Sequence, residues 1–168
     1  DRTHQSTKGL LEFMGKLRSN ELLINASPDP YVLTHPLTTE RIDALEAHVA
    51  RSPYSNVPDD PEMVALHARM RAKLIGFMTP ARALRTYKAE DTSVAARYAR
   101  AIAYFKLVRM DEFKQAIDSL IADYPNDPYF HEVKGQGLYE TGDAKAAMPS
   151  YRKAVDLLPK SDLLRMEL

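Results

Sequence analysis

The sequence contains no cysteine, so disulfide bonds and thiolate metal sites are excluded. No apolar run approaches the roughly 20 residues that a membrane span needs, and no signal peptide is recognisable. Neither sign of charge predominates, because 23 basic residues face 23 acidic ones, which gives no reason to expect a nucleic-acid partner. Glycine is scarce, with 6 residues, whereas 45% of residues are hydrophobic. This composition supplies a core, excludes wholesale disorder and favours helices.

The charge is unevenly distributed along the chain. Residues 69–114 hold 11 Lys or Arg against 4 Asp or Glu, whereas residues 115–168 hold 6 and 9. Two interpretations stay open. The basic residues form ordinary solvated helix faces, or they form a positive surface that docks an acidic segment of the same or another protein.

Apolar spacing and capping residues predict an all-α fold with two parts. An apolar stripe indicates a first helix over about 5–17, which begins without a capping leader, as expected for a fragment of a longer protein. Residues 24–38 have loop chemistry, and a second helix begins near Thr38 or Thr39. We expect residues 1–50 to form one part, 51–60 a Pro-rich linker and 61–168 a helical domain. The helices expected in that domain cover about 61–77, 80–87, 93–108, 112–123, 128–140 and 143–157, with a short last piece from Ser161 or Asp162.

Helix pairs in the second part repeat with a period of 34 residues, the period of tetratricopeptide (TPR) repeats. Segment 93–125 is the weaker copy, segment 127–159 the stronger one, and 61–90 a third, degenerate pair. The fold class is thus antiparallel helix pairs stacked as an α-solenoid, preceded by one or two other helices. We predict that Gly142 ends a helix in the left-handed conformation. The predicted repeat core consists of Ala101, Tyr104, Gly135, Leu138, Gly142, Ala147, Tyr151 and Ala154.

Two features depart from the regular repeat pattern. The turn at 109–111 of the first copy has no glycine and is predicted to be a residue or two longer than its counterpart. Pro149 falls inside a predicted helix, where it removes a backbone donor and crowds the preceding turn. We therefore expect a kink at Pro149 or a helix that starts later.

None of the five histidines completes a catalytic motif. His131-Glu132 begins a His-Glu-x-x-His pattern, but Gly135 stands where the second zinc ligand would be needed. His35 differs from the others because Pro36 holds it extended at a helix entrance. It is either a simple loop residue or a residue that acts at an active site outside this chain.

Four segments resemble parts of a known protease family. Residues 35–42 (HPLTTERI) resemble the His-Pro segment that follows the catalytic core in HtpX/Ste-type zinc metallopeptidases. Residues 72–74 (AKL), 96–101 (ARYARA) and 130–136 (FHEVKGQ) resemble the TPR tail of the periplasmic BepA/YfgC-like members. The resemblance covers essentially the whole chain, with 1–50 as the last helices of the peptidase domain and 61–168 as the TPR tail.

This resemblance implies a parent zinc metalloendopeptidase whose catalytic residues are not in this chain. The family's His-Glu-x-x-His helix and distal glutamate would precede Asp1, so the chain itself carries no catalytic residue and no cofactor. In the full-length enzyme, His35 would reach the zinc or cover the cleft.

The TPR tail implies a protein-binding module in the periplasm, whose partner is an unfolded outer-membrane protein or its assembly machinery. Stacked helix pairs form a concave surface that holds a polypeptide segment. We predict that Arg97, Tyr98, Arg100 and Lys106 line it, since aromatic and Arg side chains contribute most at such surfaces. The alternative is a stand-alone TPR scaffold or adaptor with no peptidase activity.

Overall fold

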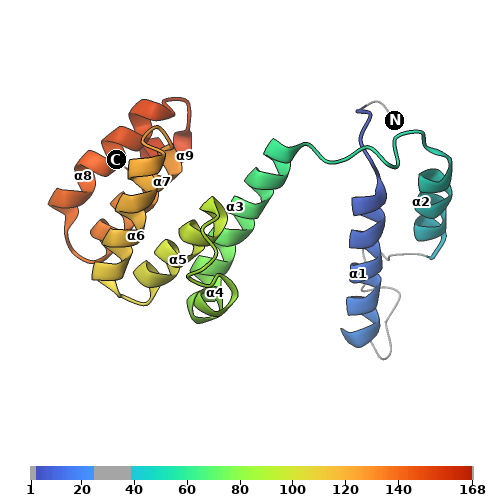
Figure 1. Ribbon diagram of the computed structural model, residues 1–168, viewed down its shortest axis with the longest axis horizontal. Coiled ribbons are helices and arrows are strands. Elements are labelled where there is room, and N and C mark those ends of the chain that lie inside the picture. Colours follow the sequence, from blue (N-terminus) through green and yellow to red (C-terminus); the bar gives the residue numbers. More distant parts are fainter. Residues whose placement is uncertain (1–2, 25–38, 168) are drawn as a thin grey trace. The chain divides into compact units, whose positions relative to one another are not determined.

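The computed structural model describes residues 3–24 and 39–167, with the side chains of 20–24 left aside. These residues form nine α-helices and no strand, which confirms the predicted all-α class (Figure 1). The chain divides into two compact units, Asp1–Pro61 and Glu62–Leu168. Each unit is described by itself below.

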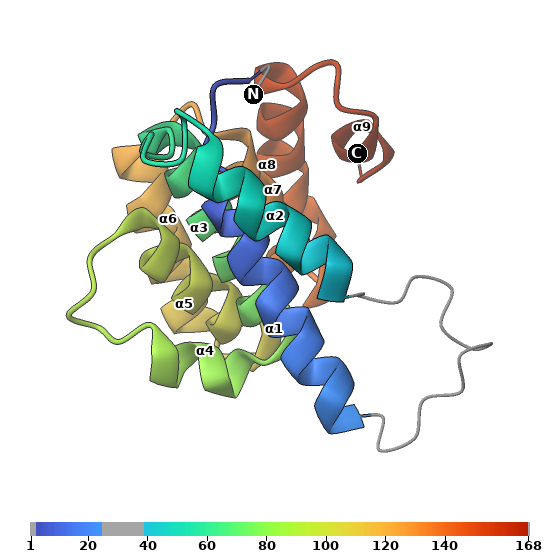
Figure 2. The same ribbon diagram turned by 90° about the vertical axis from the view of Figure 1, so that its right-hand side faces the viewer.

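In the first unit, helices α1 (Lys8–Ile24) and α2 (Thr39–Arg51) lie side by side (Figure 2). Helix α1 begins and ends later than the predicted 5–17. The predicted apolar stripe divides between two faces: Leu10 and Phe13 are exposed, whereas Leu11, Met14 and Leu17 are half-buried. Ile42 on α2 is buried.

The stretch 51–60, predicted as a linker, belongs to the first unit. The Ser6 hydroxyl donates to the Ser55 carbonyl at 2.8 Å, and Lys8 Nζ donates to Asn56 Oδ1 at 2.7 Å. The His4 ring stacks on Tyr54 with the ring centroids 4.6 Å apart. These contacts attach residues 54–56 to the start of α1. The unit boundary falls at Pro61, where the predicted linker ends.

The second unit consists of consecutive helices joined by short turns. They are α3 (Pro61–Met78), α4 (Pro80–Thr86), α5 (Val94–Lys106), α6 (Met110–Asp123), α7 (Pro128–Glu140), α8 (Ala144–Leu157) and α9 (Asp162–Glu167). Prolines open three of these helices, because the missing N–H costs nothing in the first turn. The side chains of Ser93, Asp127 and Asp143 cap α5, α7 and α8 by accepting backbone N–H bonds.

The 34-residue period appears directly in the helix bounds. Helices α5 and α7 begin at 94 and 128 and end at 106 and 140, while α6 and α8 begin at 110 and 144 and end at 123 and 157. The turns after α5 and α7 therefore have the same length, and the predicted longer turn is wrong. Val108 has a φ of 58° at the position where Gly142 has 93°. The backbone keeps its left-handed turn although no glycine is present.

The core of the second unit lies between these helix pairs. Aromatic and aliphatic side chains of α5, α6 and α7 form the main cluster, and Leu138, Ala147 and Tyr151 form a smaller one between α7 and α8. Of the predicted core positions, Tyr104 is half-buried, Gly142 is exposed in its turn, and the others are buried. Pro149 lies inside α8, which begins one residue after the predicted Asp143 and continues to Leu157.

Candidate protein-binding surface

Helix α3 presents a row of apolar side chains to solvent. The row consists of Met63, Leu66, Met70, Leu74 and Met78, which are between 46% and 78% exposed. Their spacing of three or four residues places them on one face of the helix. An exposed apolar row of this kind is a candidate interaction surface. We call it the α3 row.

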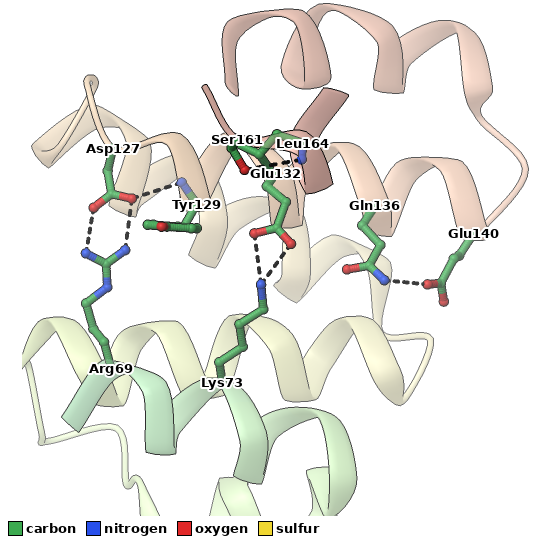
Figure 3. Close-up of polar contacts among 9 residues, drawn as sticks. All are labelled: Arg69, Lys73, Asp127, Tyr129, Glu132, Gln136, Glu140, Ser161 and Leu164. Atoms are coloured by element: carbon green, nitrogen blue, oxygen red, sulfur yellow. Dashed lines mark hydrogen bonds and ion pairs between the residues drawn. The ribbon is translucent and has the colours of Figure 1, made fainter. Parts of the chain in front are cut away.

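Two ion pairs attach α3 to α7 (Figure 3). Arg69 forms a two-pronged pair with Asp127, with N–O distances of 2.7 and 2.9 Å. One turn further along α3, Lys73 Nζ lies 2.8 and 2.9 Å from the two carboxylate oxygens of Glu132. The Glu132 side chain is only 10% exposed, so its charge depends on Lys73 for compensation. The same Asp127 carboxylate accepts the Tyr129 N–H at the start of α7.

Arg69 also lies among aromatic rings. Its guanidinium carbon is 4.7 Å from the ring centroid of Phe130, 5.6 Å from that of Tyr98 and 5.7 Å from that of Tyr129. These distances are within the range of cation–π attraction. Arg69 therefore joins α3, α5 and α7 through one side chain.

A hollow of about 300 Å³ lies beside these ion pairs. Its lining comes from α3, α5 and α7 and consists of Leu66, Arg69, Met70, Lys73, Tyr98 and Tyr129. Two members of the α3 row therefore form part of its wall. We call it the α3 hollow.

Tyr98 is the most unusual residue of this hollow. It is 2% exposed, yet its hydroxyl has no hydrogen-bond partner among the described residues. Burial, reinforced by the negative charge of Glu132, raises the pKa of the Tyr98 hydroxyl far above its usual value. The group therefore stays protonated and remains a donor at any physiological pH.

The four predicted partner-binding residues do not share one exposed face. Tyr98 is a buried member of the core and is one of the residues that line the α3 hollow. Arg97 binds Asp123 at 2.7 Å, and Arg100 donates to the backbone carbonyl of Asp91 at 2.9 Å, so it holds the loop before α5. Lys106 pairs with Glu140 at 3.4 Å and lies over the Phe105 ring.

Two of these residues meet at a second hollow. Arg97, Arg100 and Tyr104 line a space of about 270 Å³ between α5 and α6, together with polar side chains of α6. The arginines there are already bonded to Ser119, Asp123 and backbone carbonyls. Hence fewer arginine hydrogen-bond donors are available to a partner at this hollow than the sequence suggests.

Part of the uneven charge of the sequence is paired inside the second unit. Four cations of the basic stretch 69–114 each pair with an acid of the stretch 115–168. The pairs are Arg69 with Asp127, Lys73 with Glu132, Arg97 with Asp123 and Lys106 with Glu140. These four basic residues therefore have acidic partners within the same chain.

The described residues contain no group of three or more His, Cys, Asp or Glu placed to hold a metal ion. His131 is buried, and its Nε2 donates to the Pro125 carbonyl at 2.9 Å, so it holds a turn. His35 lies outside the described residues. Across the same described part of the chain, no helix is both long and apolar enough to cross a membrane.

Sequence reasoning missed the α3 row. The spacing that marks it was visible, but the same spacing on a neighbouring helix marks a core face. Only the burial of each side chain separates the two.

Comparisons of the chain with protein-family models, with curated proteins and with solved structures gave no match. The resemblance to zinc metallopeptidases therefore stays a prediction that rests on the quoted residues.

Proposed function

We propose that the chain is a protein-binding helical-repeat module that holds a segment of another protein on the α3 row and in the α3 hollow. The exposed row carries this proposal, because five apolar side chains on one helix face leave a surface that association would cover. The hollow beside it offers a concave place for one side chain, as protein-binding clefts do.

The module belongs, in this proposal, to a periplasmic zinc metallopeptidase and positions a substrate or assembly partner in outer-membrane protein quality control. The residue segments 35–42, 72–74, 96–101 and 130–136 support it, together with the 34-residue period of the helix bounds. A stand-alone scaffold is the second candidate. A His-Glu-x-x-His helix encoded upstream of Asp1 favours the first candidate, and its absence from the gene favours the second.

Binding of an unfolded outer-membrane β-barrel protein tests the proposal. We expect the full chain to bind the fluorescently labelled, urea-diluted protein, measured by anisotropy. The double variant Met70→Glu/Leu74→Glu should bind at least tenfold more weakly, because it places charges on the α3 row. Met166→Glu is the matched control, since Met166 is 83% exposed on α9, away from the row. Equal affinity of all three proteins would contradict the proposal.

A further inference from the structure

We propose that the polypeptide segment held on the α3 row carries acidic residues beside its apolar ones, and that exposed cations of α3 and α4 select it. These cations are Arg71, Arg82, Arg85 and Lys88, which we call the α3–α4 cations. This inference rests on the proposed function, from which it takes a polypeptide as the occupant. It adds the charge that the bound segment bears.

The α3 row has cations along both of its edges, and only those on one edge are neutralised. Arg69 and Lys73 extend from α3 toward α7, where each binds both oxygens of a carboxylate (Figure 3). Arg71 is exposed and precedes Leu74 by three residues and Met78 by seven, so it lies beside the row. Because successive helical residues turn by about 100°, Arg71 is on the edge opposite Lys73.

Helix α4 continues the positive charge beyond the end of the row. It begins two residues after Met78, the last residue of α3. Arg82 follows Met78 by four residues, which limits the distance between their Cα atoms to about 14 Å. Arg82 and Arg85 are three residues apart and exposed, whereas Ala83 of the same helix is fully buried. The two arginines therefore lie on one exposed face of α4.

The charge of this part of the chain is not balanced locally. Residues 63–89 contain six Lys or Arg and no Asp or Glu. Two of the six are paired with acids of α7. The other four are the α3–α4 cations, which are all exposed and form no ion pair with a described residue. Glu90, two residues after Lys88, is the nearest acid in the sequence.

The unpaired charge and the apolar row together define the partner. Arginine binds carboxylates in a two-pronged geometry, and an excess of one charge attracts a partner of opposite charge. The row beside these cations accepts apolar side chains of the same segment. A polypeptide is favoured over a lipid bilayer, because the α3 hollow of about 300 Å³ offers a concave place for one side chain.

Two fluorescent peptides with capped ends test the selection on the full chain by anisotropy. The acidic peptide is Glu-Asp-Leu-Leu-Ser-Leu-Leu-Asp-Glu, and the neutral one has Gln and Asn in place of Glu and Asp. We expect the acidic peptide to bind about tenfold more tightly, as several exposed ion pairs together supply. Between about 0.1 M and about 1 M salt this ratio should fall below about threefold, because the Debye length shrinks from about 10 Å to about 3 Å.

The variant Arg71→Gln/Arg82→Gln/Arg85→Gln removes three of the four α3–α4 cations. It should bind the two peptides within about twofold of each other, because few ion pairs are left to discriminate between them. Its affinity for the neutral peptide should equal that of the wild-type chain, which shows that the variant is folded.

The matched control is Lys145→Gln/Arg152→Gln/Lys153→Gln, which removes three exposed cations of α8 that form no ion pair with a described residue. It changes the net charge by the same amount, and the preference should persist. Three results would each overturn the inference: equal affinities for the wild-type chain, a preference that salt does not reduce, and an equal loss of preference in both variants. If the unfolded outer-membrane protein still binds in such a case, the proposed function stands without it.

Two further measurements identify the source of the negative charge. Vesicles of phosphatidylglycerol and phosphatidylcholine in equal parts should not sediment the chain. Sedimentation that the α3–α4 variant loses would make an anionic membrane the partner and overturn a polypeptide occupant. Analytical ultracentrifugation should show no dimer that the acidic peptide dissociates, and such a dimer would make a second copy the occupant and overturn a separate partner.

Discussion

Single residues determine how closely the helix pairs of the second unit approach each other. A Cβ atom at Gly135 would lie 2.9 to 3.1 Å from ring carbons of Tyr151, so α7 and α8 meet there without space for a methyl group. At Gly137 a Cβ atom would collide still more closely with Cε1 and Cζ of Phe113. Both rings are buried and have little freedom to move.

Replacement of each glycine by alanine should therefore lower the stability of the second unit by a different amount. Gly137→Ala should destabilise the second unit by about 2 kcal/mol, because overpacking outweighs the gain in helix propensity. Gly135→Ala should cost less, roughly 0 to 1 kcal/mol, since the clash is milder. Urea unfolding measures both. Gly15→Ala is the control, because nothing lies within 4 Å of its added Cβ. A Gly137→Ala variant as stable as wild type would contradict the packing.

Val108 shows the opposite case, a bulky residue where glycine fits best. Its φ of 58° places a β-branched side chain in the left-handed region, and it is 71% exposed. We expect Val108→Gly to stabilise the chain by about 0.5 to 1 kcal/mol, the relief of strain less the added freedom of the unfolded chain. Thermal unfolding checks it. The reciprocal Gly142→Val should destabilise, and stabilisation by that change would contradict the argument.

At the scale of elements, α3 is attached both by ion pairs and by apolar packing of Ala72 and Phe77. Its ion pairs reach α7 across 58 and 59 residues of sequence, and they leave the α3 row in solvent. Most apolar surface of the second unit is buried instead among α5, α6, α7 and α8. One face of α3 is thus bonded to α7, and the α3 row on another face is exposed to solvent.

Removal of one partner of the Lys73–Glu132 pair should reveal this attachment. Lys73→Met leaves the nearly buried Glu132 charge without compensation and should cost about 1 to 2 kcal/mol. The double variant Lys73→Met/Glu132→Leu should regain most of that loss, because no buried charge is then left. Arg165→Met, from an exposed pair at 3.9 Å, is the control and should cost under about 0.5 kcal/mol. Equal costs for the single and double variants would argue against a buried pair.

At the scale of the whole molecule, the two units differ in how much they bury. In the described part of the first unit, Ile42 is the one buried hydrophobic residue, whereas the second unit buries aromatic rings from α5, α6 and α7. Regions with little buried apolar surface open at lower free energy. The first unit therefore contributes less to the stability of the chain.

Amide hydrogen exchange should be slower in the second unit than in the first. Backbone amides in the middle of α5 to α8 should exchange at least 100-fold more slowly than those in the middle of α1 and α2, because their opening requires exposure of the main core. Mass spectrometry after peptic digestion measures both sets in the same sample. Similar protection in α1 and α7 would show that the first unit is as stable as the second.

Local sequence determined where most helices of the second unit begin and end. The local signals are the prolines Pro61, Pro80 and Pro128 and the capping residues Ser93 and Asp127. Like the 34-residue period, they can be recognised in the sequence without any tertiary contact. The α7 bounds and the buried positions Ala101, Leu138 and Ala154 follow from those signals.

Which side chains line the candidate binding surface was decided only by tertiary packing. The sequence could not show that Tyr98 turns inward, that Arg97 and Lys106 find acids on later helices, or that the α3 row stays exposed. The prediction of a longer turn after α5 was also wrong, because the fold imposes on Val108 a left-handed conformation that valine does not favour. The physical reason is distance along the chain. Whether a helix face is buried or exposed depends on partners many residues away, and the local spacing of apolar residues does not identify those partners.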